Sequence, residues 1–153
     1  MFVPISFMMS QDSCRPPVVL VVENNRQVLE VLGDLITDQG WTPITTPTLK
    51  GAMRSFSAQP VDAIVTDFEL DDGNSLALLE MASRCTTHRV PALVISSYAS
   101  QNLRDEVKRA GAVDLLEKPF RLETLTARLE HEFASAPGHT EQANATPVRG
   151  QAD

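Results

Sequence analysis

Five short, unbroken apolar runs, each followed by a stretch of helical periodicity, constrain the fold of this chain more than any other feature. The first run, Val18–Val22, is apolar and mostly β-branched throughout, which is typical of a strand covered on both faces. The later runs begin near residues 42, 61, 91 and 112, and the spacings of 24, 19, 30 and 21 residues each allow one crossover helix. The pattern predicts an α/β fold with a doubly wound, five-stranded parallel sheet and right-handed connections.

The stretches between these runs carry the start and stop signals of helices. Asn25 and Thr48 stand where N-caps are expected, and Gly40 and Gly111 follow the last periodic residue of two segments. In the final segment the apolar residues recur at helical spacing, which predicts one buried face made of Leu122, Leu125, Leu129 and Phe133.

The chain of 153 residues fits one domain with a single core. We expect residues 1–16 to form a flexible leader and residues 17–133 to form the folded body. Residues 134–153 contain prolines and glycines but almost no large apolar side chains, so we expect a disordered tail. About twenty residues cannot bury a core of their own, which predicts a stand-alone domain without an attached output domain.

Composition limits the partners and the compartment. A net charge of −7 and a pI near 4.9 argue against nucleic acid, because there is no excess of Lys and Arg to neutralise phosphates. The two cysteines are too few for a disulfide framework and favour a reducing compartment. The apolar start, residues 1–9, is too short to span a bilayer and lacks the basic start of a signal peptide. We therefore predict a cytoplasmic protein without nucleic-acid or membrane partners.

Charged residues stand at the ends of three predicted strands. Glu23 and Asn24 follow the first strand, Asp67 follows the third, and Lys118 follows the fifth. A carboxylate beside a buried strand is costly to desolvate, so it usually has a cation, a partner or a chemical role. In a sheet of order 2-1-3-4-5 the ligand site lies beyond the ends of the first and third strands. The pattern therefore predicts a site for a metal ion and a phosphoryl group.

Four motifs in order resemble the receiver domain of two-component response regulators, a flavodoxin-like family with a (βα)5 fold. They are residues 21–25, residues 67–73, residues 91–97, and residues 111–112 together with residues 116–120. The resemblance covers roughly residues 18–133. Each motif is short and common by itself, whereas all four in order on the appropriate elements are specific.

The resemblance implies a mechanism for signalling. Asp67 would accept a phosphoryl group from a phosphohistidine of a sensor histidine kinase or a histidine phosphotransfer protein. Lys118 and Ser96 would contact the phosphoryl oxygens, and Pro119 would follow a cis peptide bond. A downstream protein target would read the face formed by the fourth helix, fifth strand and fifth helix, roughly residues 101–133. A homodimer is also possible, and the domain would catalyse only its own phosphorylation and dephosphorylation.

The same resemblance implies a Mg²⁺ site formed by Glu23, Asn24, Asp67 and Glu69, the last through its carbonyl. The family usually has a second acid at the position of Asn24, which keeps an oxygen but lacks the charge. One unit charge about 4 Å away is worth roughly 4 kcal/mol at an effective dielectric constant near 20, before desolvation. We therefore expect Mg²⁺ binding weaker by about ten-fold or more than in a receiver with two acids, unless Glu69 supplies the missing charge.

Two further departures from the family pattern concern the conformational change. Leu115 stands where an aromatic residue is frequent, and Asp71 replaces the usual proline. Signalling would then depend on Ser96 and on backbone shifts, with Tyr98 moving in the adjacent loop. The pair Asp71 and Asp72 is interpreted as a solvated turn.

Three alternative functions remain open at this point. The departures at Asn24 and Leu115 favour a pseudo-receiver that binds proteins without being phosphorylated. A phosphatase of the haloacid-dehalogenase type would also use an Asp at a strand end, but residues 67–71 lack its second Asp and the hydroxyl after it. A flavodoxin would need a Ser/Thr/Gly-rich phosphate loop after the first strand, which is missing here.

Overall fold

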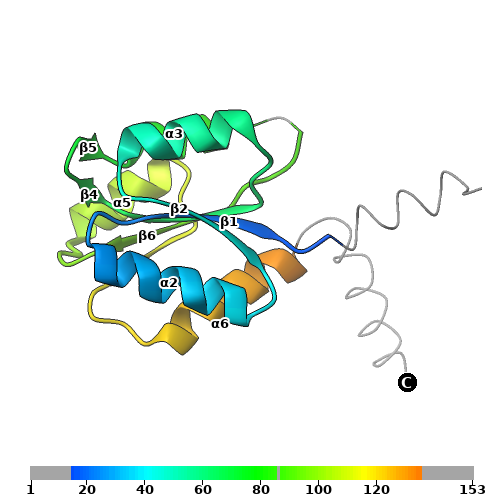
Figure 1. Cartoon of the computed structure of the whole chain (residues 1–153). Coiled ribbons are helices and arrows are strands. Elements are labelled where there is room, and N and C mark those ends of the chain that lie inside the picture. Colours follow the sequence, from blue (N-terminus) through cyan, green and yellow to red (C-terminus); the bar gives the residue numbers. More distant parts are fainter. Residues whose placement is uncertain (1–14, 86, 136–153) are drawn as a thin grey trace, which may run out of the picture.

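A computed structural model describes residues 15–85 and 87–135. Most of the predicted leader (1–16) and of the predicted tail (134–153) lies outside the described residues, so both boundaries stay predictions. A five-stranded parallel sheet in the order β2-β1-β3-β6-β7 forms the centre of the fold (Figure 1). Numbered by strand along the chain, this is the order 2-1-3-4-5, and the predicted flavodoxin-like fold is confirmed.

The strands of this sheet agree closely with the apolar runs of the sequence. β1 has its predicted bounds and β2 begins at residue 42 as predicted, while the other three begin one or two residues later than the runs do. The central strands β1 and β3 are almost completely buried, as continuous apolar runs require. The bounds are β1 (Val18–Val22), β2 (Thr42–Thr46), β3 (Ala63–Asp67), β6 (Ala92–Ser96) and β7 (Asp114–Glu117).

Five helices within residues 15–135 cover the two faces of the sheet, counting only the described residues. Figure 1 shows α2 (Arg26–Asp38) and α6 (Leu122–Ala134) on one face. The apolar side chains of α3 (Leu49–Ala58), α4 (Leu76–Ser83) and α5 (Gln101–Arg109) form the core of the opposite face. None of the helices within the described residues is long and apolar enough to cross a bilayer.

The predicted ends of the helices are confirmed where the sequence gives a clear cap. The side chains of Asn25 and Thr48 accept hydrogen bonds from the backbone N–H groups of Val28 and Gly51. Gly40 and Gly111 follow α2 and α5 with φ angles of 86° and 115°, which favour glycine at these positions.

One prediction about the core is wrong. Leu125 and Leu129 are fully buried on α6, but Leu122 is 39% exposed. Leu122 is the first residue of the helix and lies beside the loop that follows β7, where it lines an open apolar hollow together with Phe120 and Val31. Helical spacing alone therefore overstates the core at this end of α6. Phe133 at the other end is partly buried and packs edge-on against Trp41, with ring centroids 5.0 Å apart.

A short hairpin, which the sequence did not predict, follows β3. Its strands are β4 (Glu69–Leu70) and β5 (Gly73–Asn74), and they pair antiparallel. Gly73 has a φ angle of 140°, where a side chain would be strained. The hairpin holds the predicted turn residues Asp71 and Asp72 beside the end of the sheet.

Candidate functional site

Three charged side chains from distant parts of the chain meet at the carboxyl ends of the strands. Glu23 follows β1, Asp67 is the last residue of β3, and Lys118 follows β7. The Lys118 Nζ atom lies 3.0 Å from Glu23 Oε1 and 3.2 Å from Asp67 Oδ2. The peptide bond between Lys118 and Pro119 is cis, as predicted. Two carboxylates thus share one ammonium group, which leaves the cluster with an excess of one negative charge.

Burial makes this excess charge significant. Glu23 is 1% exposed, and its second oxygen accepts a hydrogen bond from the Asn25 backbone N–H at 3.0 Å. Burial, followed by repulsion from Glu23, raises the pKa of Asp67 above its ordinary value although Lys118 opposes this shift. Burial disfavours the ammonium of Lys118, but the hydrogen bond to Glu23 and the charge of Asp67 outweigh it and raise the pKa of Lys118. The site therefore favours the arrival of further positive charge.

Asn24 turns toward the hairpin and contacts an acid. Its Nδ2 atom donates a hydrogen bond to Asp71 Oδ1 at 3.0 Å. Because a carboxylate can only accept, the amide nitrogen has to face Asp71, and the amide oxygen accepts no hydrogen bond from any described residue. This oxygen is therefore available to a ligand.

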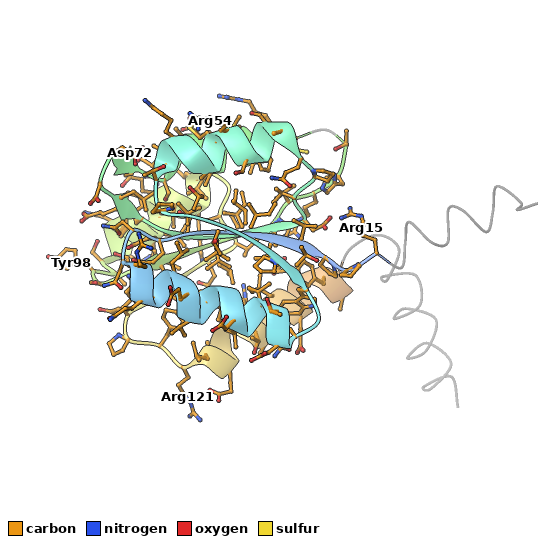
Figure 2. The ribbon with its side chains drawn as sticks, in the orientation of Figure 1. Arg15, Arg54, Asp72, Tyr98 and Arg121 are labelled. Carbon is orange, nitrogen blue, oxygen red and sulfur yellow. The ribbon has the colours of Figure 1, made fainter. Side chains whose placement is uncertain are left out.

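Ser96 lies at the end of β6, but its hydroxyl is engaged elsewhere. The hydroxyl donates to the Tyr98 carbonyl at 2.9 Å and accepts from the Tyr98 backbone N–H at 3.0 Å. Figure 2 shows the Tyr98 side chain projecting away from the body of the molecule, and it is 76% exposed. Contact between Ser96 and a group on Asp67 would require this hydroxyl to rotate.

Asp72 has a structural role that the sequence did not reveal. Its two carboxylate oxygens accept hydrogen bonds from the backbone N–H groups of Leu49 at 2.8 Å and Lys50 at 2.9 Å, at the start of α3 (Figure 2). These backbone hydrogen bonds, first that of Lys50 and then that of Leu49, hold the pKa of Asp72 below its ordinary value. Asp72 thereby fastens the hairpin to α3.

Replacing Asp72 with alanine is expected to lower the melting temperature at neutral pH. Because the folded pKa lies below the ordinary value of 3.8, the stabilisation is complete above that value and is lost as the pH falls through the folded pKa. Thermal melts of wild type and Asp72→Ala between neutral and acid pH should show a difference that shrinks on acidification. A difference that is the same at every pH would contradict this origin, and Asp72→Asn, which keeps an oxygen without a charge, provides the matched control.

The donor atoms at the site fit Mg²⁺. Within the described residues, no group of three or more His, Cys, Asp or Glu side chains could hold a metal by itself. Mg²⁺ is usually held by one or two carboxylates, other oxygens and several waters, and it does not require such a group. The Asp67 carboxylate, the Asn24 amide oxygen and the Glu69 carbonyl would supply hard oxygen ligands. The two oxygens of the predicted ligand Glu23 each accept one hydrogen bond and keep a further lone pair for the metal or one of its waters.

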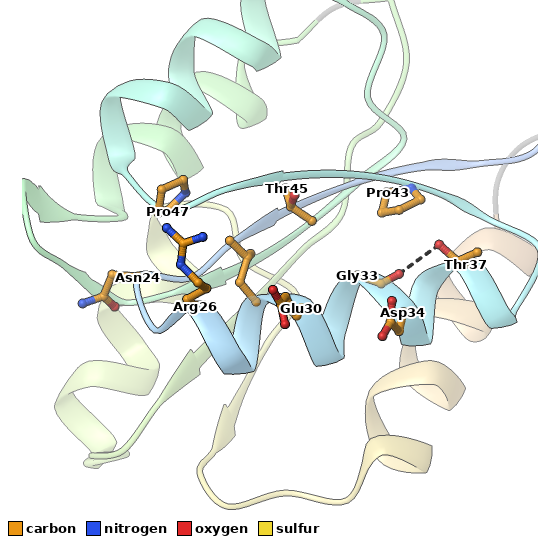
Figure 3. A pocket seen from close by; sticks show the side chains of 10 residues that line it. Asn24, Arg26, Glu30, Gly33, Asp34, Thr37, Pro43, Thr45 and Pro47 are labelled. Carbon is orange, nitrogen blue, oxygen red and sulfur yellow. Dashed lines mark hydrogen bonds between the residues drawn. The ribbon is translucent and has the colours of Figure 1, made fainter.

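A separate groove runs between α2 and the free edge of β2. Figure 3 shows Asn24 near one end and the α2 carboxylates Glu30 and Asp34 along it. The volume of the groove is about 600 Å³, but neither Asp67 nor Lys118 lines it. The groove and the acidic site therefore share only the neighbourhood of Asn24.

Comparison with known proteins assigns the family. Residues 19–130 match the response regulator receiver domain, so the chain belongs to this family of two-component signal transduction. The family is not one of conventional enzymes, which removes the phosphatase alternative. The transcriptional regulatory protein KdpE of Mycobacterium tuberculosis H37Rv is 30% identical over 112 residues, covering 73% of this chain and 49% of KdpE. The chain thus spans about half the length of that relative.

Solved structures support the same fold. A CheY-like receiver domain protein from Methanospirillum hungatei has a TM-score of 0.73 at 18% identity, covering 78% of this chain and 95% of that one. The non-phosphorylated HemR receiver domain of Leptospira biflexa has a TM-score of 0.69 at 27% identity, covering 75% and 92%. The likeness extends over nearly the whole length of both structures.

Proposed function

We propose that this chain is a phosphorylation-dependent receiver that takes a phosphoryl group on Asp67 from a phosphohistidine. The donor would be a sensor histidine kinase or a histidine phosphotransfer protein. The contact of Lys118 with both Glu23 and Asp67 supports the proposal, since a partly buried carboxylate, an ammonium group and an excess negative charge lie together in one site.

In the transfer step, an Asp67 carboxylate oxygen attacks phosphorus, an O–P bond forms, and the N–P bond of the phosphohistidine breaks. The bond electrons leave with the imidazole nitrogen. Asp67 Oδ2 accepts from Lys118, and we assign the attack to Oδ1, which accepts no hydrogen bond from a described side chain. A carboxylate suffices as nucleophile because phosphoryl transfer depends mainly on positioning and charge neutralisation.

Charge neutralisation comes from two sources. The ammonium group of Lys118 lies between the two acids and would turn toward a phosphoryl oxygen. A lysine ammonium is a compact charge on a flexible side chain, which suits this contact. Mg²⁺, when bound, neutralises further charge on the phosphoryl oxygens. Glu23, Asn24, Asp67 and the Glu69 carbonyl would hold it. Its affinity is the property most affected by asparagine at position 24.

The output would pass to another protein through the face of α5, β7 and α6. The Arg104 Nη1 atom of α5 donates to the Leu115 carbonyl of β7 at 3.1 Å, which joins two elements of this face. Rotation of Ser96 toward a phosphorylated Asp67 would release the Tyr98 backbone at the edge of the same face. The proposal also includes a downstream protein target, a homodimer through this face and a cytoplasmic location.

Incubation with acetyl phosphate and Mg²⁺ should add one phosphoryl group to the wild type, detected by intact mass. The Asp67→Asn variant should gain none, because an amide is not a usable nucleophile for this step. Asp62→Asn is the matched control: Asp62 precedes β3 at the opposite end of that strand and should leave phosphorylation unchanged.

A wild type that gains no phosphoryl group at saturating Mg²⁺ would contradict this function and favour the pseudo-receiver. The same conclusion would follow if Asp67→Asn were modified as completely as the wild type. The experiment should be repeated over a range of Mg²⁺ concentrations, because Asn24 is expected to weaken metal binding. At a low Mg²⁺ concentration the extent of phosphorylation would be underestimated.

A further inference from the structure

Two of the departures from the receiver pattern contact each other. Asn24 stands where the family usually has an acid, and Asp71 stands where it usually has a proline. The two positions are 47 residues apart in the chain, yet the Asn24 amide donates to the Asp71 carboxylate at 3.0 Å. Asn24 lacks the negative charge of an acid, and the residue that it contacts in space, Asp71, carries one.

We propose that Asp71 is a positioning residue for Mg²⁺, which supplies through the Asn24 amide the negative charge that Asn24 lacks. The inference rests on the proposed function, because it concerns the metal that assists phosphoryl transfer. Asp71 does not replace a ligand: it orients the Asn24 amide so that its oxygen remains available, and it adds a negative charge beside that oxygen.

The orientation follows from hydrogen-bond chemistry. The Asp71 carboxylate accepts and cannot donate, so it selects the amide arrangement in which nitrogen faces the hairpin. By donating to a carboxylate, the Asn24 amide also becomes more polarised, which increases the negative charge on the amide oxygen. A neutral residue at position 71 would provide neither effect to the same degree.

The hairpin holds Asp71 in place for this role. On one side of Asp71, Leu70 pairs with Gly73 in the β4–β5 ladder. On the other side, Asp72 is bound by two backbone N–H groups at the start of α3. Asp71 is therefore confined between two anchored residues and loses little conformational freedom on contacting Asn24.

Glu69 is the competing source of charge, and the structure favours Asp71 over it. The Glu69 side chain is exposed and forms no hydrogen bond or ion pair within the described part of the chain. Asp71 is also exposed, but its carboxylate directly contacts a residue that would bind the metal. A double-mutant comparison separates the two acids, because only Asp71 should depend on the residue at position 24.

The test is Mg²⁺ binding by isothermal titration calorimetry at one fixed ionic strength, without any phosphoryl donor. Asp71→Asn should weaken Mg²⁺ binding about three- to ten-fold, because it removes one exposed charge near the cation and also reduces the polarisation of the Asn24 amide. In the Asn24→Asp background the same change should have less than about a two-fold effect, because no amide is left to orient or polarise and only the screened through-space attraction of the Asp71 charge remains. Asn24→Asp should also restore the affinity that Asp71→Asn removes.

Glu69→Gln is the matched control, since it removes one charge from the same hairpin and keeps the backbone carbonyl. It should change Mg²⁺ affinity less than Asp71→Asn does, and thermal melts should show that Asp71→Asn leaves the fold intact. Equal losses in the two variants, an unchanged affinity in Asp71→Asn, the same loss in both backgrounds, or no measurable Mg²⁺ binding by the wild type would overturn the inference. Phosphorylation of Asp67 is measured separately by mass, so such a result would leave the proposed function standing.

Discussion

Replacing Lys118 with glutamine is expected to slow the phosphorylation of Asp67 by about 10²-fold or more, the usual result of removing one fixed donor from a site where charge develops. The ammonium now lies 3.0 Å from Glu23 and 3.2 Å from Asp67, and it is the cation that reaches both carboxylates. Without it, the negative charge of an arriving phosphoryl group would meet the buried Glu23 and the partly buried Asp67, which only backbone hydrogen bonds and the metal would then compensate.

The measurement is the rate of mass increase with acetyl phosphate at saturating Mg²⁺. Lys108→Gln makes the same change of charge on the exposed surface of α5 and should keep the wild-type rate. If Lys118→Gln is modified at Asp67 as fast as the wild type, the ammonium has no part in the transfer.

Leu129→Ala is expected to reduce the free energy of unfolding by about 3 kcal/mol. Leu129 is fully buried on α6 and belongs to the cluster that includes Leu32 of α2 and Val65 of β3. Removing its side chain leaves a cavity between a helix and the centre of the sheet, which close packing on both sides prevents from collapsing. Urea unfolding followed by circular dichroism measures the effect.

Leu122→Ala supplies the control for this prediction, because it makes the same chemical change in the same helix. Leu122 is 39% exposed, so its removal should cost less than about 1 kcal/mol. Equal losses in the two variants would mean that the destabilisation arises from α6 itself and not from burial.

The sequence was sufficient for the sheet because the strands carry a signal that depends on local residues alone. The continuous apolar run at residues 18–22 gave β1 its bounds, and the caps at Asn25 and Thr48 marked where two helices begin. Glu23, Asp67 and Lys118 could be brought together in advance because parallel strands place their carboxyl ends at one edge.

Other features depended on pairs of residues that no local pattern connects. The hairpin after β3 has only two residues in each strand, which is too short for a recognisable alternation of apolar and polar residues. Asp71 contacts Asn24, which is 47 positions away in the chain. Asp72 contacts the start of α3, which is 22 to 23 positions away. Such pairing follows from where the folded hairpin lies, which the sequence did not reveal.

Helical periodicity was also an incomplete guide to burial on α6. Leu122 matches the apolar face but lies at the end of the helix, where less of the sheet remains to cover it. Glu132 is 7% exposed despite its charge, because Arg89, just before β6, forms an ion pair with it at 2.9 Å. The identity of a residue does not reveal such a distant partner.

In the proposed function, the two hydrogen bonds between Ser96 and the backbone of Tyr98 would set the output of the unphosphorylated protein. At about 1 kcal/mol each, they would favour the hydrogen-bonded arrangement of Ser96 over the rotated one by about 2 kcal/mol of free energy. A difference of that size leaves roughly 3% of molecules in the rotated arrangement without any phosphoryl donor. Such a receiver would show a small basal output. Weakening the hydrogen bonds between Ser96 and Tyr98 would raise this output before any stimulus arrives.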